Sequence, residues 1–298
     1  MAFKFSSASS LIMILLPFFL CRHCYADTNE HVGYSCYVDS SKANKSSTWT
    51  ENRNSMFRKL EENVILNNGY YIAEAGEKGP DRAYGLIQCR GDVSKSNCTN
   101  CTRRSFILNV NDPSCGKGVL TWQTWCLLRY SNVSFFGTWE KNSLTVSQSN
   151  RASLVEQSVA AAKGKMLMMG LAEAAPGDSL MFAKGEIDDG LGGKRYGTAQ
   201  CTRDLGKSAC RDCLEWLVEG FARNVSDDRS RTINGVGCFM IYDNTSFYFN
   251  LTAEEGLGKP APPKSNPAAP PKSNAPNRGL AGRLSMAITI FMTTMAFL

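Results

Sequence analysis

The amino-acid sequence predicts an α+β fold made of two tandem copies of one disulfide-stapled domain. Three observations lead to this prediction. The chain begins with an apolar segment typical of export, a cysteine pattern occurs twice at a constant offset, and each copy shows the same succession of helix-like and strand-like periodicity. A length of 298 residues suits two domains of ordinary size.

Residues 1–26 are expected to form a signal peptide. Lys4 gives a positive start, Leu11–Leu20 is an apolar run, and small residues precede a cut after Ala26. The ten residues of this run are too few to cross about 30 Å of hydrocarbon. Export places the rest of the chain in an oxidising compartment, where cysteines form disulfides.

A cysteine pattern of the form C-x8-C-x2-C occurs twice. An offset of 112 residues relates four cysteines of one copy to four of the other: Cys89, Cys98, Cys101 and Cys126 correspond to Cys201, Cys210, Cys213 and Cys238. The same offset carries Tyr84-Gly85 onto Tyr196-Gly197 and Gln88 onto Gln200. A shared offset for so many positions indicates a duplicated domain, with the copies at 27–139 and 140–254.

Periodicity predicts the elements of each copy in order. Helices are expected at Glu51–Leu66 and Cys98–Val110, with counterparts at Ser153–Met169 and Cys210–Phe221. Strands are expected in four segments of the first copy and in their equivalents 112 residues on: Tyr70–Glu74, Tyr84–Arg90, Leu120–Tyr130 and Phe135–Trp139. Two helices against a small antiparallel sheet make an α+β domain.

Ten of the twelve cysteines remain after the signal peptide is cut, an even number that suits five disulfides. Cys36 and Cys115 have no counterpart in the second copy, where Gln148 and Asp227 stand, so we expect them to pair with each other. A bond between Cys98 and Cys101, three residues apart, would be strained. We therefore favour four further pairs: Cys89–Cys98, Cys101–Cys126, Cys201–Cys210 and Cys213–Cys238.

The C-terminal part predicts a membrane anchor. Residues 255–283 form a linker rich in Pro, Ala, Ser and Asn, and residues 284–298 form a mostly apolar tail. This arrangement is typical of a glycosylphosphatidylinositol signal, with Ser273 or Asn274 as the candidate attachment residue. A short single-pass helix is the alternative, but fifteen residues fall below the usual ~20.

The doubled C-x8-C-x2-C pattern, preceded each time by Tyr-Gly in an exported chain, resembles the plant cysteine-rich repeat secretory proteins built of ginkbilobin-type domains. It is also similar to the ectodomains of cysteine-rich receptor-like kinases and of plasmodesmata-located proteins. The resemblance covers roughly Cys36–Asn250. It implies two helices packed on a five-stranded antiparallel sheet in each domain. It also implies the disulfide pairing that we favour from the repeat.

The resemblance includes a mannose-binding lectin, ginkbilobin, whose ligand contacts are an Asn, an Arg and a Glu. The corresponding positions in this chain are Tyr37, Leu120 and Ser131 in the first domain, and Ser149, Thr232 and Asp243 in the second, with Arg231 as a neighbour. Only Asp243 keeps the chemical type, and a neutral hydroxyl or aliphatic side chain cannot replace a guanidinium fork or a pair of acceptor oxygens at a sugar hydroxyl. Mannose binding is therefore not expected, and the ligand-binding residues stay unknown.

Catalytic chemistry has little support in the sequence. The mature chain keeps one histidine, His31, so we expect no enzyme, no metal site and no cofactor. We interpret Asp188-Asp189 as a turn and Glu254-Glu255 as a solvated loop. The formal net charge of +6 falls to +2 without the two ends of the chain, so nucleic acid is not an expected partner.

Five sequons predict N-glycosylation at the surface: Asn44, Asn132, Asn224, Asn244 and Asn250. Asn132 and Asn244 occupy the same place in both repeats, so glycans there would mark one edge and leave a binding face elsewhere. At least one of Trp122 and Trp125 is expected in the core, and the other is expected either to be buried as well or to form an exposed contact.

We therefore expect a non-enzymatic module on the outer face of the plasma membrane or in the cell wall, with plasmodesmata as a specific location. Its expected partner is an extracellular glycan or a protein ectodomain, in interaction or defence signalling. The alternative function is a soluble, secreted antimicrobial lectin of the mannose-binding type.

Overall fold

The computed structural model describes residues 28–36, 46–110, 115–148, 158, 160–190, 192–223 and 230–258. The expected signal peptide and apolar tail lie outside these residues, as do Asn44, Asn224, Ser273 and Asn274. Among the described residues, no helix has the length and apolar character needed to cross a membrane.

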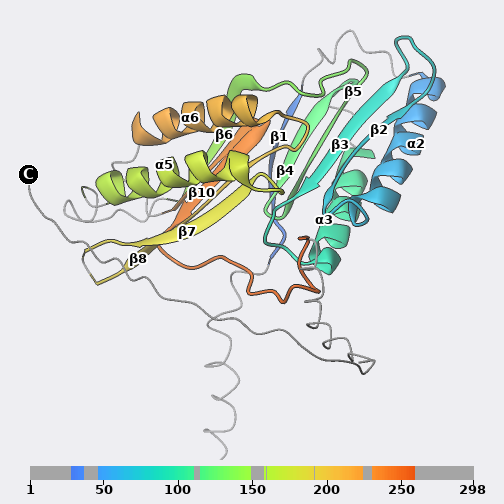
Figure 1. Ribbon diagram of the computed structural model, residues 1–298. Helices are drawn as coiled ribbons and strands as arrows, with labels where there is room; N and C mark the ends of the chain where they lie inside the picture. Colours follow the sequence, from blue (N-terminus) through green and yellow to red (C-terminus); the bar gives the residue numbers. More distant parts are fainter. Residues whose placement is uncertain are drawn as a thin grey trace, which may run out of the picture. The chain divides into compact units, whose positions relative to one another are not determined.

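The first domain is a five-stranded antiparallel sheet with two helices on one side (Figure 1). Its elements follow in chain order: β1 (His31–Cys36), α2 (Ser47–Val64), β2 (Tyr70–Ala75), β3 (Ala83–Cys89), α3 (Lys95–Val110), β4 (Val119–Gln123) and β5 (Cys126–Ser131). The strand order across the sheet is β1-β4-β5-β3-β2.

The second domain repeats this topology, with the strand order β6-β9-β10-β8-β7. Its elements are β6 (Glu140–Gln148), α5 (Lys165–Ala174), β7 (Phe182–Asp188), β8 (Lys194–Cys201), α6 (Lys207–Arg223), β9 (Ser230–Val236) and β10 (Cys238–Asp243). A π-helical turn at Ala160–Gly164 precedes α5, and a 3-10 turn at Ala175–Gly177 follows it. The predicted fold class, two domains with two helices on five strands, is confirmed.

The helix of the first repeat begins earlier than its apolar periodicity indicated. Ser46 caps α2, because its hydroxyl accepts a hydrogen bond from the backbone N–H of Trp49 at 3.0 Å. The equivalent helix of the second repeat, α5, spans Lys165–Ala174 and so continues past the predicted end at Met169, while the predicted start at Ser153 lies outside the described residues. In the π-helical turn before α5, backbone hydrogen bonds join residues five apart in place of four. The spacing of apolar residues alone does not reveal such a turn.

The strand predicted at Leu120–Tyr130 is in fact a hairpin of β4 and β5, which turns at Thr124 and Trp125. Neither residue is a turn former, and the turn is held from outside: the N–H of Thr124 donates to Glu30 O at 3.0 Å, and the N–H of Arg90 donates to Trp125 O at 2.8 Å. The strand predicted at Phe135–Trp139 is wrong, since these residues form a turn between the domains.

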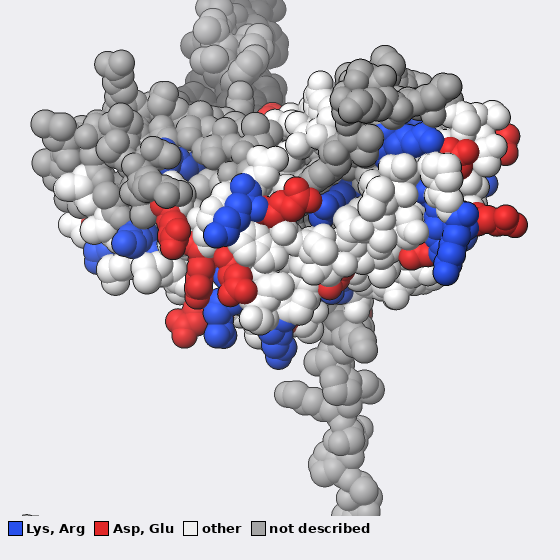
Figure 2. Space-filling model, turned by 90° about the horizontal axis from the view of Figure 1, so that it is seen from above, with Lys and Arg blue, Asp and Glu red and all other residues white. Residues whose placement is uncertain are grey.

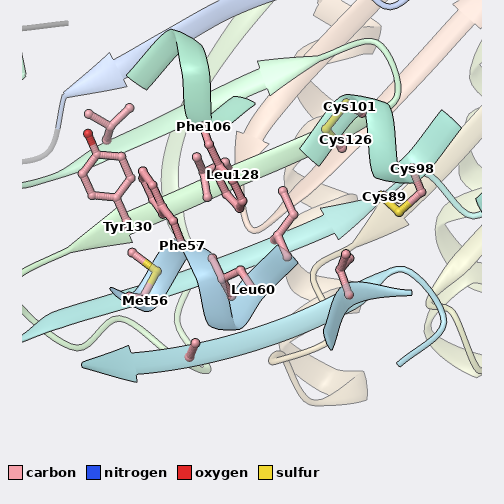
Figure 3. Packing of buried hydrophobic residues seen from close by; sticks show 14 of the residues in the cluster. Met56, Phe57, Leu60, Cys89, Cys98, Cys101, Phe106, Cys126, Leu128 and Tyr130 are labelled. Atoms are coloured by element: carbon pink, nitrogen blue, oxygen red, sulfur yellow. A yellow bond between two sulfur atoms is a disulfide. The ribbon is translucent and has the colours of Figure 1, made fainter. Parts of the chain in front are cut away.

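Buried side chains between helices and sheet form the core of each domain. Phe57 and Phe106 stack with ring centroids 4.5 Å apart, and Phe57 meets Tyr130 edge-on at 5.4 Å (Figure 3). The Tyr-Gly pair of each repeat lets the helix approach the sheet. A Cβ on Gly85 would overlap the Met56 sulfur, and one on Gly197 would lie 2.9 Å from Leu171 Cδ1.

The five disulfides are the pairs that the repeat favoured: Cys36–Cys115, Cys89–Cys98, Cys101–Cys126, Cys201–Cys210 and Cys213–Cys238. The sheet register explains the shared pattern. Cys89 and Cys126 lie opposite each other on β3 and β5, and their partners Cys98 and Cys101 lie one turn apart on α3. Two disulfides thus fasten each second helix to the centre of its sheet.

Candidate functional site

The face of each sheet that carries no helix turns toward the other domain. On the first sheet this face carries Leu86, Leu120, Trp122 and Leu127, and Phe135 of the connecting turn and Val236 of β9 pack against them. One apolar cluster thus contains residues of both domains. This cluster is the apolar part of the contact between the two domains.

Polar contacts fix the two domains to each other. Gln88 Nε2 donates to Cys201 O at 2.7 Å, and Gln200 Nε2 donates to Cys89 O at 3.3 Å. Arg203 reaches in the opposite direction: its guanidinium lies 4.8 Å from the centre of the Tyr70 ring and donates to the carbonyl oxygens of Asn67 and Asn68 at 3.0 and 2.7 Å. The contact therefore combines hydrogen bonds with a cation–π pair.

Burial dominates the electrostatics of this contact. It lowers the pKa of Arg203 to about 10, against the opposing effect of the Tyr70 and Asp178 charges. Burial likewise raises the pKa of Tyr70 well above its usual range, assisted by Asp204. Both shifts report that water is largely excluded where the domains meet.

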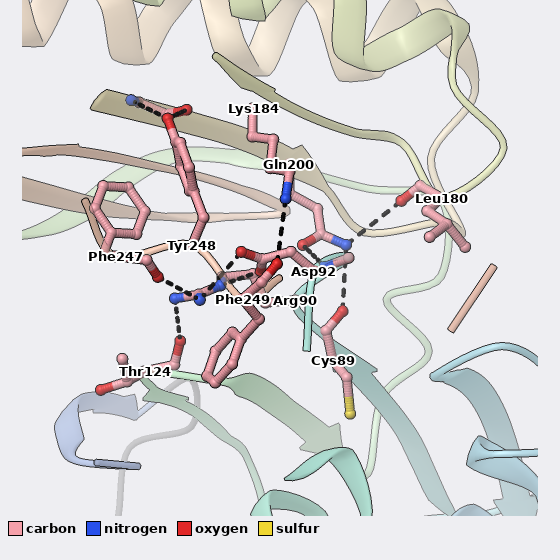
Figure 4. A network of polar contacts seen from close by, with 12 residues as sticks. Cys89, Arg90, Asp92, Thr124, Leu180, Lys184, Gln200, Phe247, Tyr248 and Phe249 are labelled. Carbon is pink, nitrogen blue, oxygen red and sulfur yellow. Dashed lines mark hydrogen bonds and ion pairs between the residues drawn. The ribbon is translucent and has the colours of Figure 1, made fainter. Parts of the chain in front are cut away.

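A second buried network centres on Arg90, directly after β3 (Figure 4). Its guanidinium pairs with Asp92, with Arg90 Nε 2.5 Å from Asp92 Oδ1, and donates to Thr124 O at 3.4 Å and Phe247 O at 3.3 Å. The same group lies 5.7 and 5.3 Å from the ring centres of Phe247 and Phe249. One first-domain arginine thus holds the chain that leaves the second domain.

That chain segment, residues 247–258, returns to the first domain. Phe249 meets Trp125 edge-on at 5.9 Å, the N–H of Lys95 donates to Glu255 O at 2.9 Å, and Leu257 is buried within the first-domain core. We call this segment the strap. Composition predicts a linker at residues 255–283, but residues 255–258 belong to the folded body.

A groove of about 790 Å³ lies between the two helix-free faces. Its first wall includes Val32, Trp122 and Leu127, and its second includes Thr232, Asn234, Phe239 and Ile241 from β9 and β10. Hydroxyl side chains line it from both domains: Thr28, Thr124, Ser230, Thr245 and Ser246. A concave apolar floor with a few convergent polar groups is typical of a binding site.

Three residues that line this groove, Trp122, Trp125 and Asn234, carry a buried side-chain N–H donor that lacks a partner among the described residues. Trp122 and Asn234 are 3% and 5% exposed. Within the described part of the chain, neither Trp122 Nε1 nor Asn234 Nδ2 has a hydrogen-bond acceptor. A buried donor without an acceptor costs roughly 1–3 kcal/mol, so the groove is suited to a molecule that supplies acceptor oxygens.

The charges of the groove are few. Arg90 is neutralised by Asp92, and Asp243 Oδ1 accepts hydrogen bonds from the N–H and hydroxyl of Thr245, both at 2.7 Å. Acidic and basic side chains also alternate on the surface drawn in Figure 2. The described residues contain no group of three or more His, Cys, Asp or Glu side chains placed to hold a metal ion.

The residues singled out from the sequence fall in different places. Thr232 and Asp243 line the groove, as does His31 at the start of β1, whereas Leu120 belongs to the apolar cluster below it. Tyr37 and Ser149 lie outside the described residues. Asp188 and Asp189 form the turn between β7 and β8, and Glu254 and Glu255 are exposed.

Sequence reasoning missed Trp122 and Asn234 as a pair. Both tryptophans of the β4–β5 hairpin are buried, so the interpretation of one as an exposed contact is wrong. One feature of the sequence pointed to this region: a glutamine, Gln88 or Gln200, directly precedes the first cysteine of the C-x8-C-x2-C pattern in both repeats. It marked the contact between the domains, and the groove lies next to that contact.

A family model described as "Salt stress response/antifungal" matches residues 35–133 and 145–245. The chain belongs to this family. The two matched segments correspond to the two sheets with their helices, so each domain is one family unit. The predicted resemblance to cysteine-rich repeat secretory proteins is confirmed.

Relatives within the family include secreted proteins and receptors. An antimicrobial ginkbilobin-2-like protein of Castanea crenata is 32% identical over 60% of this chain and 73% of its own length. Probable cysteine-rich repeat secretory protein 6 of Arabidopsis thaliana is 28% identical over 69% of this chain and 78% of its own. Cysteine-rich receptor-like protein kinase 29 of Arabidopsis thaliana is 26% identical over 88% of this chain. The match spans only 38% of that kinase's length.

Two solved structures share the tandem fold. The tandem DUF26 ectodomain of the Arabidopsis thaliana cysteine-rich receptor-like protein PDLP5 matches with a TM-score of 0.59 and 21% identity, over 73% of this chain and 100% of that one. The PDLP8 ectodomain matches with a TM-score of 0.58 and 18% identity. The family's tandem ectodomain is therefore the fold of this chain, of the extracellular type found in receptor-like proteins.

Proposed function

We propose that the chain is a non-enzymatic binding module of the outer cell surface, and that the groove between its domains holds an uncharged stretch of an extracellular glycan. One observation carries this proposal. Residues on both walls of the groove, among them Trp122 and Asn234, carry buried N–H donors that lack an acceptor oxygen within the described part of the chain. They come from different domains, so a ligand would bridge both.

The surroundings of these donors support an uncharged ligand. Hydroxyl groups of Ser230, Thr232 and Thr245 can both donate and accept, which matches a polyhydroxylated chain. Phe239, which is half-buried in the second wall, adds apolar surface on which a sugar ring can lie. A strongly charged ligand would meet no free compensating charge on Arg90, because Asp92 already pairs with it.

Binding without catalysis is supported by the way the charged groups are engaged. The carboxylate of Asp243 is tied to the turn that follows it, and the guanidinium of Arg90 is tied to Asp92 and to two backbone carbonyls. Because these charged groups already make hydrogen bonds and ion pairs within the protein, they are poorly placed to transfer protons to or from a ligand.

The test is oligosaccharide binding by the full chain, produced in plant cells and measured by calorimetry. The probes are cellohexaose, mannohexaose and a xyloglucan heptasaccharide, with an oligogalacturonide as the charged comparison. We expect binding to at least one neutral probe. Trp122→Phe and Asn234→Leu should each weaken it about 5- to 100-fold, as expected from a lost hydrogen bond to a buried donor.

Matched controls separate the groove from the fold. Trp216→Phe changes a tryptophan of α6 that packs near Trp139, and Asn63→Leu changes a half-buried asparagine of α2 whose side chain donates to Lys59 O. Neither should alter the affinity. If no neutral probe binds, or if Trp216→Phe weakens binding as much as Trp122→Phe, the proposal is wrong. A protein ectodomain captured through the groove would then be the partner.

We further propose that a lipid anchor at Ser273 or Asn274 holds the chain at the plasma membrane. The support is the Pro-rich spacer and the apolar residues 284–298. Phosphatidylinositol-specific phospholipase C should release both domains from intact cells. Retention, with residues 284–298 detected in the mature protein, would show a transmembrane tail. Imaging of the tagged chain tells whether it concentrates at plasmodesmata.

A defence role is a second candidate, favoured by one observation. The ginkbilobin-2-like relative from Castanea crenata, 32% identical, is named as antimicrobial. If this chain shares that property, it should inhibit fungal growth after release from the membrane. Trp122→Phe should reduce the inhibition if the groove is responsible, and Trp216→Phe should not.

A further inference from the structure

The two sequons that occupy equivalent places in the repeats lie in different surroundings. Asn132 follows β5, is half-buried, and its Nδ2 donates to Pro80 O at 3.3 Å. Asn244 follows β10, is exposed, and lines the groove. Asn132 is not among the groove residues. Asn244 thus lies on the candidate binding face, whereas Asn132 lies away from it.

The turn that carries Asn244 is firmly built. Asp243 Oδ1 accepts hydrogen bonds from both the N–H and the hydroxyl of Thr245, at 2.7 Å each, so the backbone around Asn244 is held at the mouth of the groove. A group attached to the Asn244 amide thus begins at the rim and not on the helical side of the domain.

The groove runs back from this rim along β9 and β10. Asn234 lies opposite Phe239 in the ladder, and Phe239 is five residues before Asn244. At about 3.4 Å per residue, the rim lies roughly 17 Å from the donor of Asn234 along the strand. An N-linked glycan of several sugar rings extends over a comparable distance.

We propose that the N-glycan of Asn244 lies along this groove and supplies acceptor oxygens to Asn234 Nδ2 and Trp122 Nε1. In the attachment step, the Asn244 amide nitrogen loses a proton and bonds to C1 of a lipid-linked oligosaccharide, and the lipid diphosphate leaves. This inference rests on the proposed function in one respect: the glycan occupies the site of the external ligand and competes with it. Removal of the glycan opens the groove.

The experiment uses the full chain, secreted from yeast with ¹⁵N-labelled tryptophan. Its five tryptophans all lie among the described residues, so five indole N–H signals are expected, and Trp122→Phe assigns one of them. We expect the Trp122 signal to move upfield in Asn244→Gln, because its hydrogen bond is lost. Enzymatic release of the glycan from the folded chain should give the same shift. Asn132→Gln, the matched control, should leave it in place.

Three results would overturn the inference. Mass spectrometry could find Asn244 without a glycan, the Trp122 signal could stay unchanged in Asn244→Gln, or Asn132→Gln could move it equally. The competition is measured separately with cellohexaose, mannohexaose and the xyloglucan heptasaccharide, whose affinity should rise at least 3-fold in Asn244→Gln. Binding of these probes with an unmoved Trp122 signal would contradict this inference alone. A moved signal without probe binding would contradict the proposed function alone.

Discussion

Gln88 and Gln200, 112 residues apart in the chain, make matching pairs of hydrogen bonds to each other's domain. The amide nitrogen of each donates to the carbonyl oxygen of the other domain's cysteine, Cys201 or Cys89. The amide oxygen of each accepts a hydrogen bond from the backbone N–H of the residue two positions after that cysteine. Gln88 Oε1 accepts from Arg203 at 2.8 Å, and Gln200 Oε1 accepts from Gly91 at 3.2 Å. The duplicated domains therefore meet with local two-fold symmetry.

Replacing either glutamine should destabilise the pair of domains. Gln88→Leu and Gln200→Leu each leave one backbone N–H and one carbonyl without a side-chain partner, which costs about 1–3 kcal/mol. Because both residues serve one contact, we expect the double variant to lose less than the sum of the two. Urea unfolding of the full chain measures these free energies. Strict additivity would show that the two sets of bonds are independent.

Arg90 should matter far more than an exposed arginine with the same kind of partner. Arg90→Met leaves the buried carboxylate of Asp92 without its partner, and we expect a loss of about 3–5 kcal/mol. Arg103→Met is the control, because Arg103 pairs with Glu61 at the surface and should cost no more than about 1 kcal/mol. Similar losses in urea unfolding for both variants would contradict the structural role of Arg90.

The strap can be tested through Leu257, which is 1% exposed in the first-domain core. Leu257→Ala should lower the free energy of unfolding by about 2–5 kcal/mol, because it leaves a cavity beside Gly69 and α2. Leu66→Ala makes the same chemical change at a side chain that is 78% exposed, and should cost at most about 0.5 kcal/mol. Equal effects would mean that the strap does not complete the core.

We expect the buried hydroxyl of Tyr248 to make the folded protein less stable at alkaline pH. Its hydroxyl donates to Gly197 O at 2.9 Å and accepts from Gly197 N at 2.8 Å, and burial raises its pKa from 10.0 to about 12. The stabilisation is full below pH 10, where the unfolded tyrosine is neutral, and is lost as pH rises toward 12. Tm should therefore fall between pH 10 and 12, less steeply in Tyr248→Phe.

The control for this titration is Tyr34→Phe, at a tyrosine that is 48% exposed on β1. It should leave the slope of Tm against pH unchanged. Burial also raises the pKa of Tyr242 to about 12, so part of the slope should persist in Tyr248→Phe. A slope that is identical in all three proteins would contradict the assignment to Tyr248.

Much of the fold follows from local signals in the sequence. The cysteines report their own pairing, because the second repeat lacks the counterparts of Cys36 and Cys115 together. The hairpin of β4 and β5 could not be predicted, because its turn at Thr124 and Trp125 depends on Glu30 and Arg90, which are distant in sequence.

The candidate site follows even less from the sequence. Trp122 and Asn234 face one groove only because two sheets from different domains meet, and no periodicity within one repeat encodes that meeting. The same applies to the strap, where Leu257 follows a loop yet fills the core of the first domain. The sequence around a single apolar residue after a loop does not indicate which core that residue packs into.

The position of Leu257 also sets a timetable for biosynthesis. The last strand of the first sheet ends at Ser131, so 126 further residues must be made before Leu257 exists. At a rate of synthesis of about 5–20 residues per second, the core of the nascent first domain stays incomplete for roughly 6 to 25 s. During that interval its cysteines are already present, and their disulfides can form before the core closes. An enzyme that oxidises thiols can therefore reach the cysteines of the first domain before the core around them is complete.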